Sequence, residues 1–340
     1  MRVLAVTNMY PTRGDPVYGS FVARQMASVK AAGAHVDVLF VDGRRGMWRY
    51  PAAIWRVARA LRRGRIDVVH AHYGLTGFFA SFHQRPLVVS YCGDDLLGTP
   101  NGRGGTTFKS RVTQYLSQLA ASRADGIICK SEALRQELRA DPDRNRAHVI
   151  GNGVPTDLFH PGSRSDARSQ LGLPLDERLV LFPHSRSQAA VKRFALAEQA
   201  IARLREMGLT ARLWIVNGVP PDDMPAYYRA ADCLLVTSAH EGGPNVVKEA
   251  LCCDLPVVST DVGDVRMWTE RTGGCRIVSD SATNIATALK ELLTGRSAVN
   301  GAAVRALLSM DAVASRILEV YVEAVTQRKR LGLVATRLLQ

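Results

Sequence analysis

Residues 232–265 constrain the fold of this chain more than any other segment. Short apolar runs at 234–236 and 255–259 predict two buried parallel strands. Between them, residues 244–252 have helical spacing, and Pro244 suits the first turn of a helix, where its missing N–H would be unsatisfied anyway. Strand, helix and strand in this order predict a parallel sheet covered by helices.

The loop before this predicted helix favours an anion. Gly242 and Gly243 precede Pro244, so backbone without side chains leads into exposed helix N–H groups, which attract a phosphate. Two carboxylates are close by, Glu241 in the loop and Glu249 in the helix. A carboxylate in such a site accepts hydrogen bonds from vicinal hydroxyls, as the acidic residue of dinucleotide folds does with ribose. The alternative is that both are solvated glutamates.

The segment as a whole resembles the donor-site signature of family 4 glycosyltransferases. The matching residues are Ser238, Glu241, Gly242, Pro244, Glu249 and Ala250, followed by 256–258, Thr260, Asp261 and Gly263. In that family the second glutamate, here Glu249, binds the nucleotide ribose, and the first, here Glu241, faces the donor sugar. Gly242, Gly243, Pro244 and Asn245, at the start of the predicted helix, are also expected to contribute to donor binding.

Some positions depart from the family pattern. Asp254 and Asp264 stand where glycines are usual, and because they lie beside the motif we expect them to bear on donor identity. In the first half of the chain, Cys92 occupies the place of the usual histidine, and we assign it no catalytic role. The carboxylates that follow, Asp94 and Asp95, are predicted to lie on the acceptor side.

Further site residues are expected at strand ends. His72 ends an apolar strand, where ligands bind in open α/β sheets; a buried, hydrogen-bonded histidine is the alternative. The family has a loop with two adjacent glycines near the donor phosphate, and the loop that contains Gly19 resembles it with one glycine. The alternative is an ordinary strand-to-helix turn. Arg186 and Lys192 follow a strand at the place where the family has two cations that neutralise the leaving diphosphate. Gly218, after the next strand, is a candidate nucleotide contact.

Length and composition limit the class of protein. The 340 residues suffice for two α/β domains, and 46% hydrophobic with 22% charged residues is typical of a soluble globular protein. No apolar run approaches the about 20 residues of a membrane span, and the first residues are too short an apolar run for a secretory signal. Six cysteines without metal-ligand spacing indicate reduced thiols and a cytoplasmic location.

The net charge of +13 implies an anionic partner. No zinc-finger or aromatic RNA-binding signature accompanies it, so nucleic acid is not expected. Residues 47–65 predict a basic amphipathic helix with tryptophans, typical of a peripheral contact with an anionic membrane. We expect its arginines to face that surface and its apolar stripe to pack on the sheet; the stripe is Ile54, Trp55, Ala58 and Leu61.

Strand–helix alternation runs through both halves of the chain. Residues 3–7, 19–32 and 36–41 predict the strand, helix and strand that open a Rossmann-like half, and the turn formers at 151–155 mark a linker. With the resemblance, this predicts an α/β chain of GT-B fold, with two Rossmann-like domains facing each other across a cleft. The expected parts are an acceptor-binding domain at 1–153, a nucleotide-sugar-binding domain at 154–310, and at 311–340 a helix crossing back toward the first domain with a basic tail.

The resemblance implies a retaining glycosyltransferase that moves a hexose from a nucleoside-diphosphate sugar to a hydroxyl acceptor. The expected acceptor is a lipid-linked or cell-envelope glycan at the inner membrane face. Arg186, Lys192 and Glu241 are the expected catalytic residues. Cations placed where charge grows on the leaving diphosphate, here Arg186 and Lys192, supply the main catalytic effect, and the resemblance implies that Glu241 faces the donor sugar. No metal and no cofactor besides the donor are expected. The alternatives are a nucleotide-sugar epimerase of the same fold and a non-catalytic two-domain binding protein.

Overall fold

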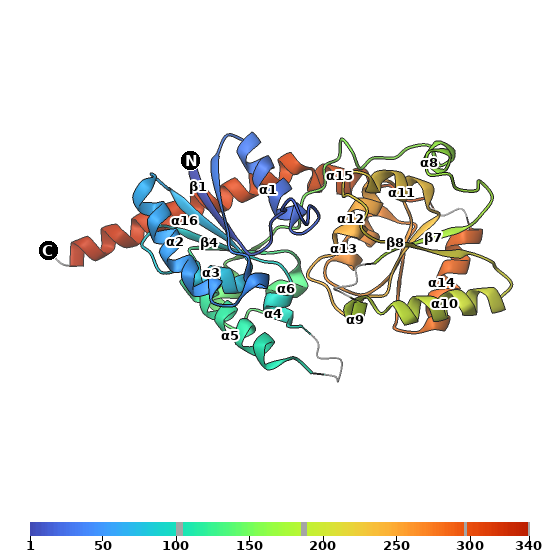
Figure 1. The fold of residues 1–340 in the computed structure, drawn as a ribbon, viewed down its shortest axis with the longest axis horizontal. Helices are drawn as coiled ribbons and strands as arrows, with labels where there is room; N and C mark the ends of the chain where they lie inside the picture. Colours follow the sequence, from blue (N-terminus) through green and yellow to red (C-terminus); the bar gives the residue numbers. More distant parts are fainter. Residues whose placement is uncertain (100–104, 185–188, 296–297, 339–340) are drawn as a thin grey trace. The chain divides into compact units, whose positions relative to one another are not determined.

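The structure, a computed structural model, describes residues 1–99, 105–184, 189–295 and 298–338. The chain divides into two compact units, residues 1–153 with 310–340 (unit 1) and residues 154–309 (unit 2). Each unit is a parallel sheet with helices on both faces (Figure 1). The predicted α/β fold class with two Rossmann-like halves is confirmed.

Unit 1 contains a parallel sheet with the strand order β2-β1-β3-β4-β5-β6. Its strands are β1 (Arg2–Thr7), β2 (His35–Phe40), β3 (Val68–His72), β4 (Leu87–Tyr91), β5 (Gly126–Cys129) and β6 (Ala147–Val149). Its helices are α1 (Ser20–Ala31), the short η1 (Gly43–Arg45), α2 (Arg49–Arg63), α3 (Gly74–Ala80), α4 (Asp94–Leu97), α5 (Phe108–Arg123), α6 (Glu132–Gln136), α7 (Asp141–Asn145) and α16 (Met310–Leu338).

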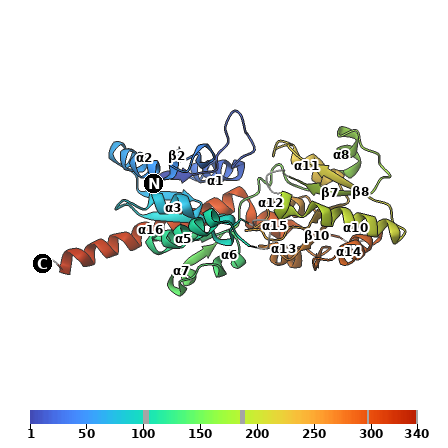
Figure 2. The same ribbon diagram turned by 60° about the horizontal axis from the view of Figure 1, so that its bottom comes forward.

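The two faces of this sheet are covered by different helices. Side chains of α2, α3 and α5 share one core with alternate strand residues such as Val69 and Ala71. On the other face α16 lies against α1 and the middle strands, where Val320 and Ala324 approach Gly126 (Figures 1 and 2). Because both faces are covered, β3 and β4 are fully buried, including the polar side chains of His70, His72 and Ser90.

Unit 2 contains a parallel sheet with the strand order β11-β10-β9-β7-β8. Its strands are β7 (Leu179–Pro183), β8 (Arg212–Val216), β9 (Cys233–Val236), β10 (Val257–Thr260) and β11 (Arg276–Val278). Its helices are α8 (Arg164–Gln170), α9 (Ala189–Lys192), α10 (Phe194–Glu206), α11 (Met224–Ala230), α12 (Asn245–Cys252), α13 (Val265–Thr272), α14 (Ala282–Thr294) and α15 (Ala302–Leu308). Helices α10 and α14 lie side by side on one face (Figure 2).

Each sheet has a topological switch point. In unit 1 the chain leaves β1 for β2 on one side and then places β3 on the other; in unit 2 it leaves β7 for β8 and then places β9 on the other side. The loops after such strand pairs diverge and leave a crevice at the carboxyl ends, where α/β sheets bind ligands. The two crevices therefore lie after β1 and β3, and after β7 and β9.

The orientation of α2 corrects one prediction. Its buried residues are Tyr50, Ala53 and Val57, whereas Trp55, expected in the buried stripe, is 80% exposed. The small side chain of Ala53 lets the helix approach the sheet, and the hydroxyl of Tyr50 accepts a hydrogen bond from Asn8 Nδ2 at 3.0 Å. Trp55 consequently lies among the arginines. None of the described helices is long and apolar enough to cross a lipid bilayer.

Candidate active site

The loop after β9 is joined to the end of α9 by a half-buried ion pair. Lys192 Nζ lies 2.6 Å from Glu241 Oε1, and the two side chains are only 13% and 16% exposed. Ser238 Oγ donates to the same carboxylate oxygen at 3.0 Å, and Thr237 Oγ1 donates to the backbone oxygen of Lys192 at 2.6 Å. The structure thus brings together two predicted site residues at the β7–β9 switch point.

Arg193 holds this arrangement, although the sequence pattern assigned it no role. Its guanidinium donates to the backbone oxygens of Thr237 and Ser238 at 2.6 and 2.8 Å and forms an ion pair with Asp280. Hydrogen bonding from Arg193 lowers the pKa of the Asp280 carboxyl. Arg193 adopts φ 49°, a conformation that costs free energy in a residue other than glycine. The bonds to the β9 loop keep it there, and its neighbour Lys192 is positioned as a result.

The N-terminus of α12 has the expected open backbone. The helix begins at Asn245, and Pro244 is its N-cap rather than part of its first turn as predicted, with ψ 119°. Gly263, with φ 58°, packs so closely on this loop that a Cβ there would lie 3.0 Å from Glu241 O and Gly243 N. Two loops without bulky side chains therefore meet in front of the first helical N–H groups, a geometry suited to an anion.

The aspartates at usual glycine positions have structural partners, and their expected bearing on donor identity stays a prediction. Asp264 Oδ2 lies 2.8 Å from the fully buried Lys248 Nζ and accepts Trp268 Nε1 at 2.8 Å. Lys248 also donates to Gly243 O at 3.4 Å, so the pair braces the glycine loop from behind. Asp254, with φ 57°, accepts hydrogen bonds from Gly301 N and from Arg305, at 2.7 and 2.8 Å.

Glu249 projects from α12 and is clamped by a neighbouring helix. Tyr228 in α11 donates its hydroxyl hydrogen to Glu249 Oε2 at 2.8 Å. Gly218, after β8, has φ 72° and no atom within 4 Å of the place a Cβ would take. Arg186 lies outside the described residues. His184, which follows β7 and was not predicted, has a buried Nδ1 with no hydrogen-bond partner in the described chain.

A cavity of about 330 Å³ lies at the β1–β3 switch point of unit 1. Asn8 follows β1, is 8% exposed, and its Oδ1 has no hydrogen-bond partner among the described residues. Tyr73 follows β3 with φ 80°, a strained conformation of the kind that clusters at functional sites. The remaining walls come from Tyr18, Gly43, Arg44, Met47, Tyr50, Leu75, Thr99, Thr107, Lys109, Ser110 and Thr113.

His72 does not line this cavity, which corrects its predicted role. It lies on the face of β3 that α16 covers, with its ring centroid 4.2 Å from that of His70, whose Nδ1 is 2.6 Å from the Tyr321 hydroxyl of that helix. His72 is fully buried. Burial, followed by the nearby His70 and Lys130, holds the pKa of His72 well below its ordinary value. The alternative, an interior histidine, describes it better, although neither ring nitrogen has a hydrogen-bond partner among the described residues.

Asp95 is also a structural residue rather than an acceptor ligand. It is fully buried, and its carboxylate accepts hydrogen bonds from the backbone N–H groups of Gly74 and Gly93, both at 2.8 Å, and of Cys92 at 3.1 Å. Asp94 beside it is exposed. Burial, followed by the charge of Asp95, raises the pKa of the Cys92 thiol to about 12, so this thiol is neutral and a poor nucleophile.

Gly19 is explained by packing alone. It is the N-cap of α1 with φ 72°, and a Cβ there would lie 2.3 Å from the carbonyl carbon of Met9. The loop from β1 therefore requires a glycine here whether or not a phosphate binds, in agreement with an ordinary strand-to-helix turn.

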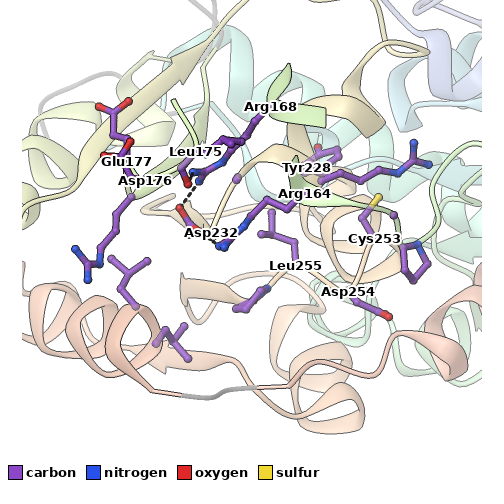
Figure 3. Close-up of a pocket in the computed structure, with 18 of the residues that line it drawn as sticks. Arg164, Arg168, Leu175, Asp176, Glu177, Tyr228, Asp232, Cys253, Asp254 and Leu255 are labelled. Carbon is purple, nitrogen blue, oxygen red and sulfur yellow. Dashed lines mark hydrogen bonds and ion pairs between the residues drawn. The ribbon is translucent and has the colours of Figure 1, made fainter. Parts of the chain in front are cut away.

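The wide hollow in Figure 3 lies at the opposite edge of the unit 2 sheet. Asp232 and Pro256 line it and directly precede β9 and β10, so it lies at the amino ends of the strands. Asp232 is engaged there by Arg164 and by Arg168, the latter at 2.7 Å. This hollow of about 620 Å³ contains none of the predicted site residues. Within the described part of the chain, no cluster of His, Cys, Asp or Glu is placed to hold a metal ion.

Comparison with known proteins agrees with this arrangement. Residues 1–153 match the model of a glycosyl transferase 4-like domain, and residues 177–295 match that of glycosyl transferases group 1. The chain belongs to the family 4 type of glycosyltransferases. This family 4 member is 29% identical over 246 residues to D-inositol 3-phosphate glycosyltransferase of Mycolicibacterium smegmatis. The aligned region covers 63% of this chain and 56% of that protein. The chain thus spans little more than half the length of this relative.

Solved structures show the same fold. Sucrose-phosphate synthase from Thermosynechococcus elongatus has a TM-score of 0.68 at 18% identity, covering 100% of this chain and 99% of that one. Anabaena HepE in complex with UDP-glucose has a TM-score of 0.63 at 18% identity, covering 99% and 100%. The likeness confirms the predicted GT-B fold for this family 4 glycosyltransferase.

Proposed function

We propose that this family member is a retaining, metal-independent glycosyltransferase that moves a hexose from a nucleoside-diphosphate sugar to a hydroxyl acceptor. The observation that carries the proposal is the half-buried Lys192–Glu241 pair beside the open N-terminus of α12. A cation, helix N–H groups and a carboxylate at one switch point match what a sugar diphosphate presents, which is anionic phosphates next to hydroxyls.

We infer that the ion pair between Lys192 and Glu241 opens when the donor binds. A diphosphate approaching Lys192 offers it an anion that also reaches the N–H groups of α12, and Glu241 is then released toward the hydroxyls of the sugar. As the glycosidic bond breaks, charge grows on the diphosphate next to Lys192, where fixed positive groups lower the barrier. We expect Arg186 to add a second cation. These groups meet the charge without a metal, and the departing phosphate takes the acceptor proton.

The donor to test first is a UDP-hexose. Anabaena HepE, which shares the fold of this chain, is a protein whose structure contains UDP-glucose. Glu249, held by Tyr228, is the proposed ribose ligand, because a carboxylate with a fixed plane can accept both hydroxyls of a vicinal diol.

The unit 1 cavity is the proposed acceptor site. No carboxylate is among the described residues that line it. Arg44 is already paired with Asp15 and Asp42, at 2.8 and 3.1 Å, whereas Lys109 forms no ion pair with any residue that the structure describes. This supports an acceptor that combines hydroxyls with a negative charge. The name of the D-inositol 3-phosphate glycosyltransferases agrees with such a polyol, and an anionic lipid-linked or cell-envelope glycan has the same chemistry.

The exposed side of α2 supports peripheral contact with an anionic membrane at the inner face. Trp48 and Trp55 are 66% and 80% exposed, and Arg56 and Arg59 are exposed beside Trp55. We call these four residues the basic tryptophan surface. Aromatic rings that enter the interface and arginines that pair with lipid phosphates are the usual features of interfacial helices.

The experiment that tests the proposal follows the products. The chain is incubated with UDP-glucose, with and without an acceptor panel of neutral and phosphorylated polyols, and both UDP and the glycoside are measured. A glycoside that retains the anomeric configuration and forms only with acceptor supports the proposal. Free sugar released without any acceptor favours the epimerase. Binding of nucleotides without turnover of UDP-, GDP- or ADP-sugars favours a binding protein.

A further inference from the structure

Tyr228 connects the interior of unit 2 to the predicted ribose ligand. Its side chain is 1% exposed, and its ring lies against Phe159 with the centroids 6.0 Å apart. The ring also forms part of the wall of the hollow in Figure 3. Its hydroxyl reaches across from α11 to Glu249 Oε2 in α12 at 2.8 Å. Tyr228 was not among the predicted site residues, because it lies outside the family signature.

We propose that Tyr228 is a positioning residue for the donor, which holds the Glu249 carboxylate in the plane that receives the two ribose hydroxyls. The inference rests on the proposed function, in which Glu249 binds ribose. In this proposal Tyr228 acts through Glu249 and does not itself contact the nucleotide, so its effect on binding depends on the presence of those hydroxyls.

Geometry explains why a clamp matters here. The last torsion of a glutamate side chain is broad and roughly two-fold, so an unrestrained carboxylate samples many planes, and only some of them offer an oxygen to both hydroxyls of a vicinal diol. A hydrogen bond to one oxygen selects a plane in advance and reduces the entropy lost on binding.

The hydroxyl of Tyr228 is suited to this task. Burial, followed by the negative charge of Glu249, holds the pKa of Tyr228 well above its ordinary value. The phenol therefore stays protonated at neutral pH, where it donates to the carboxylate. Its ring is fixed by the surrounding core, so the donor is held in one place.

A purely structural role is the competing explanation. Buried tyrosine hydroxyls usually find a hydrogen-bond partner, and the loss of such a bond costs stability wherever it lies. The two roles differ in one observable. A structural bond affects all nucleotides equally, whereas a positioning bond affects nucleotides with an intact ribose diol more than those without.

The test is the variant Tyr228→Phe, which removes one oxygen atom and keeps the ring. Affinities are measured by calorimetry for UDP and 2′-deoxy-UDP, or for the corresponding GDP or ADP pair if one of those binds the wild type more tightly. We expect the wild type to prefer the ribonucleotide by about tenfold or more, the effect of a charge-assisted hydrogen bond. In Tyr228→Phe this preference falls to at most about threefold, through weaker binding of the ribonucleotide alone.

Tyr227→Phe is the matched control. Tyr227 is the next residue of the same helix, and its ring stacks on Trp214 with the centroids 5.1 Å apart; its variant should keep the wild-type preference. Thermal melts of both variants report folding. If Tyr228→Phe does not fold, Tyr228→Met, which fills the space flexibly without a hydroxyl, replaces it.

The possible outcomes are distinguishable. An unchanged ribose preference in Tyr228→Phe overturns the inference and leaves the proposed function intact. A wild type that binds nucleotides without preferring ribose over deoxyribose also overturns it, by removing the role of Glu249. A wild type that binds no nucleoside diphosphate overturns the proposed function and the inference with it.

Discussion

Lys192 and Glu241, 49 positions apart in the chain, neutralise each other at a distance of 2.6 Å in the structure. Removing one partner of a pair that has little contact with water is costly, because the other charge is left without a partner. A ligand that replaces one partner by another of equal charge avoids that cost. In the proposed function a diphosphate is such a ligand for Lys192, and the first prediction follows from this pair.

Lys192→Ala should lower kcat by about a hundredfold or more, which corresponds to about 2.7 kcal/mol of transition-state stabilisation. The charge that develops on the diphosphate then has no ammonium beside it. The measurement is steady-state turnover at saturating donor, with Lys30→Ala on α1 of unit 1 as the control for loss of a lysine. Turnover within a few-fold of wild type would remove Lys192 from the catalytic residues.

Chelation of metals should leave activity unchanged, because Lys192, the α12 N–H groups and the expected Arg186 meet the diphosphate charge. Initial rates are compared before and after dialysis against EDTA, then after addition of Mg²⁺. Activity that disappears with EDTA and returns with Mg²⁺ would mean that a divalent cation supplies the charge instead.

Lys109→Gln should raise KM for a phosphorylated polyol acceptor by about tenfold and leave KM for the neutral polyol unchanged, since a charged hydrogen bond is worth about 1.5–3 kcal/mol. Glucose 6-phosphate with glucose, and an inositol monophosphate with inositol, provide matched pairs. Lys30→Gln is the control. Equal changes in KM for both members of a pair would show that Lys109 does not interact with the acceptor phosphate.

Acid should destabilise unit 1 through its buried histidines. Burial, followed by the charge of Lys130, lowers the pKa of His70 to about 3, against about 6.5 in an unfolded chain. The unfolded chain therefore takes up a proton first as pH falls, so the contribution of His70 is complete above pH 6.5 and is lost toward pH 3. At pH 5 the loss is about 2 kcal/mol.

The measurement is the melting temperature between pH 7 and pH 5. His70→Gln should melt lower at pH 7, because it loses the contacts with Tyr321 and Ser90, but it should show a smaller further drop at pH 5. His160→Gln, which changes an exposed histidine, should follow the wild type. An identical pH dependence in wild type and His70→Gln would contradict the assignment.

Replacing Trp55 by Ala together with Arg56 and Arg59 by Gln should weaken binding to phosphatidylglycerol vesicles by at least about tenfold, because each arginine near an anionic surface is worth about 1 kcal/mol. Wild-type binding should also fall as salt rises, since exposed charges are screened. Leu175→Ala removes an exposed apolar side chain from unit 2 and serves as the control. Vesicle binding that is indifferent to salt would refute a role for the basic tryptophan surface.

Local signals were sufficient for much of the fold. The apolar runs around 234–236 and 255–259 became β9 and β10, because buried parallel strands are apolar on both faces and need no alternation. The glycines and proline before α12 marked its start within one residue, since their backbone preferences are intrinsic. Resemblance to the family signature led to the prediction that Glu241, Gly242 and Glu249 are donor-site residues. This needed no tertiary structure, because the signature is a contiguous run of residues.

The sequence by itself determined the order of strands and helices and the motif beside α12, because both are written in neighbouring residues. Only the tertiary structure decided which charges meet. It paired Lys192 with Glu241, gave Asp264 to Lys248, and clamped Glu249 with Tyr228. Such partners are set by how helices and loops pack, since a polar group withdrawn from water is stabilised by whichever partner the fold places beside it.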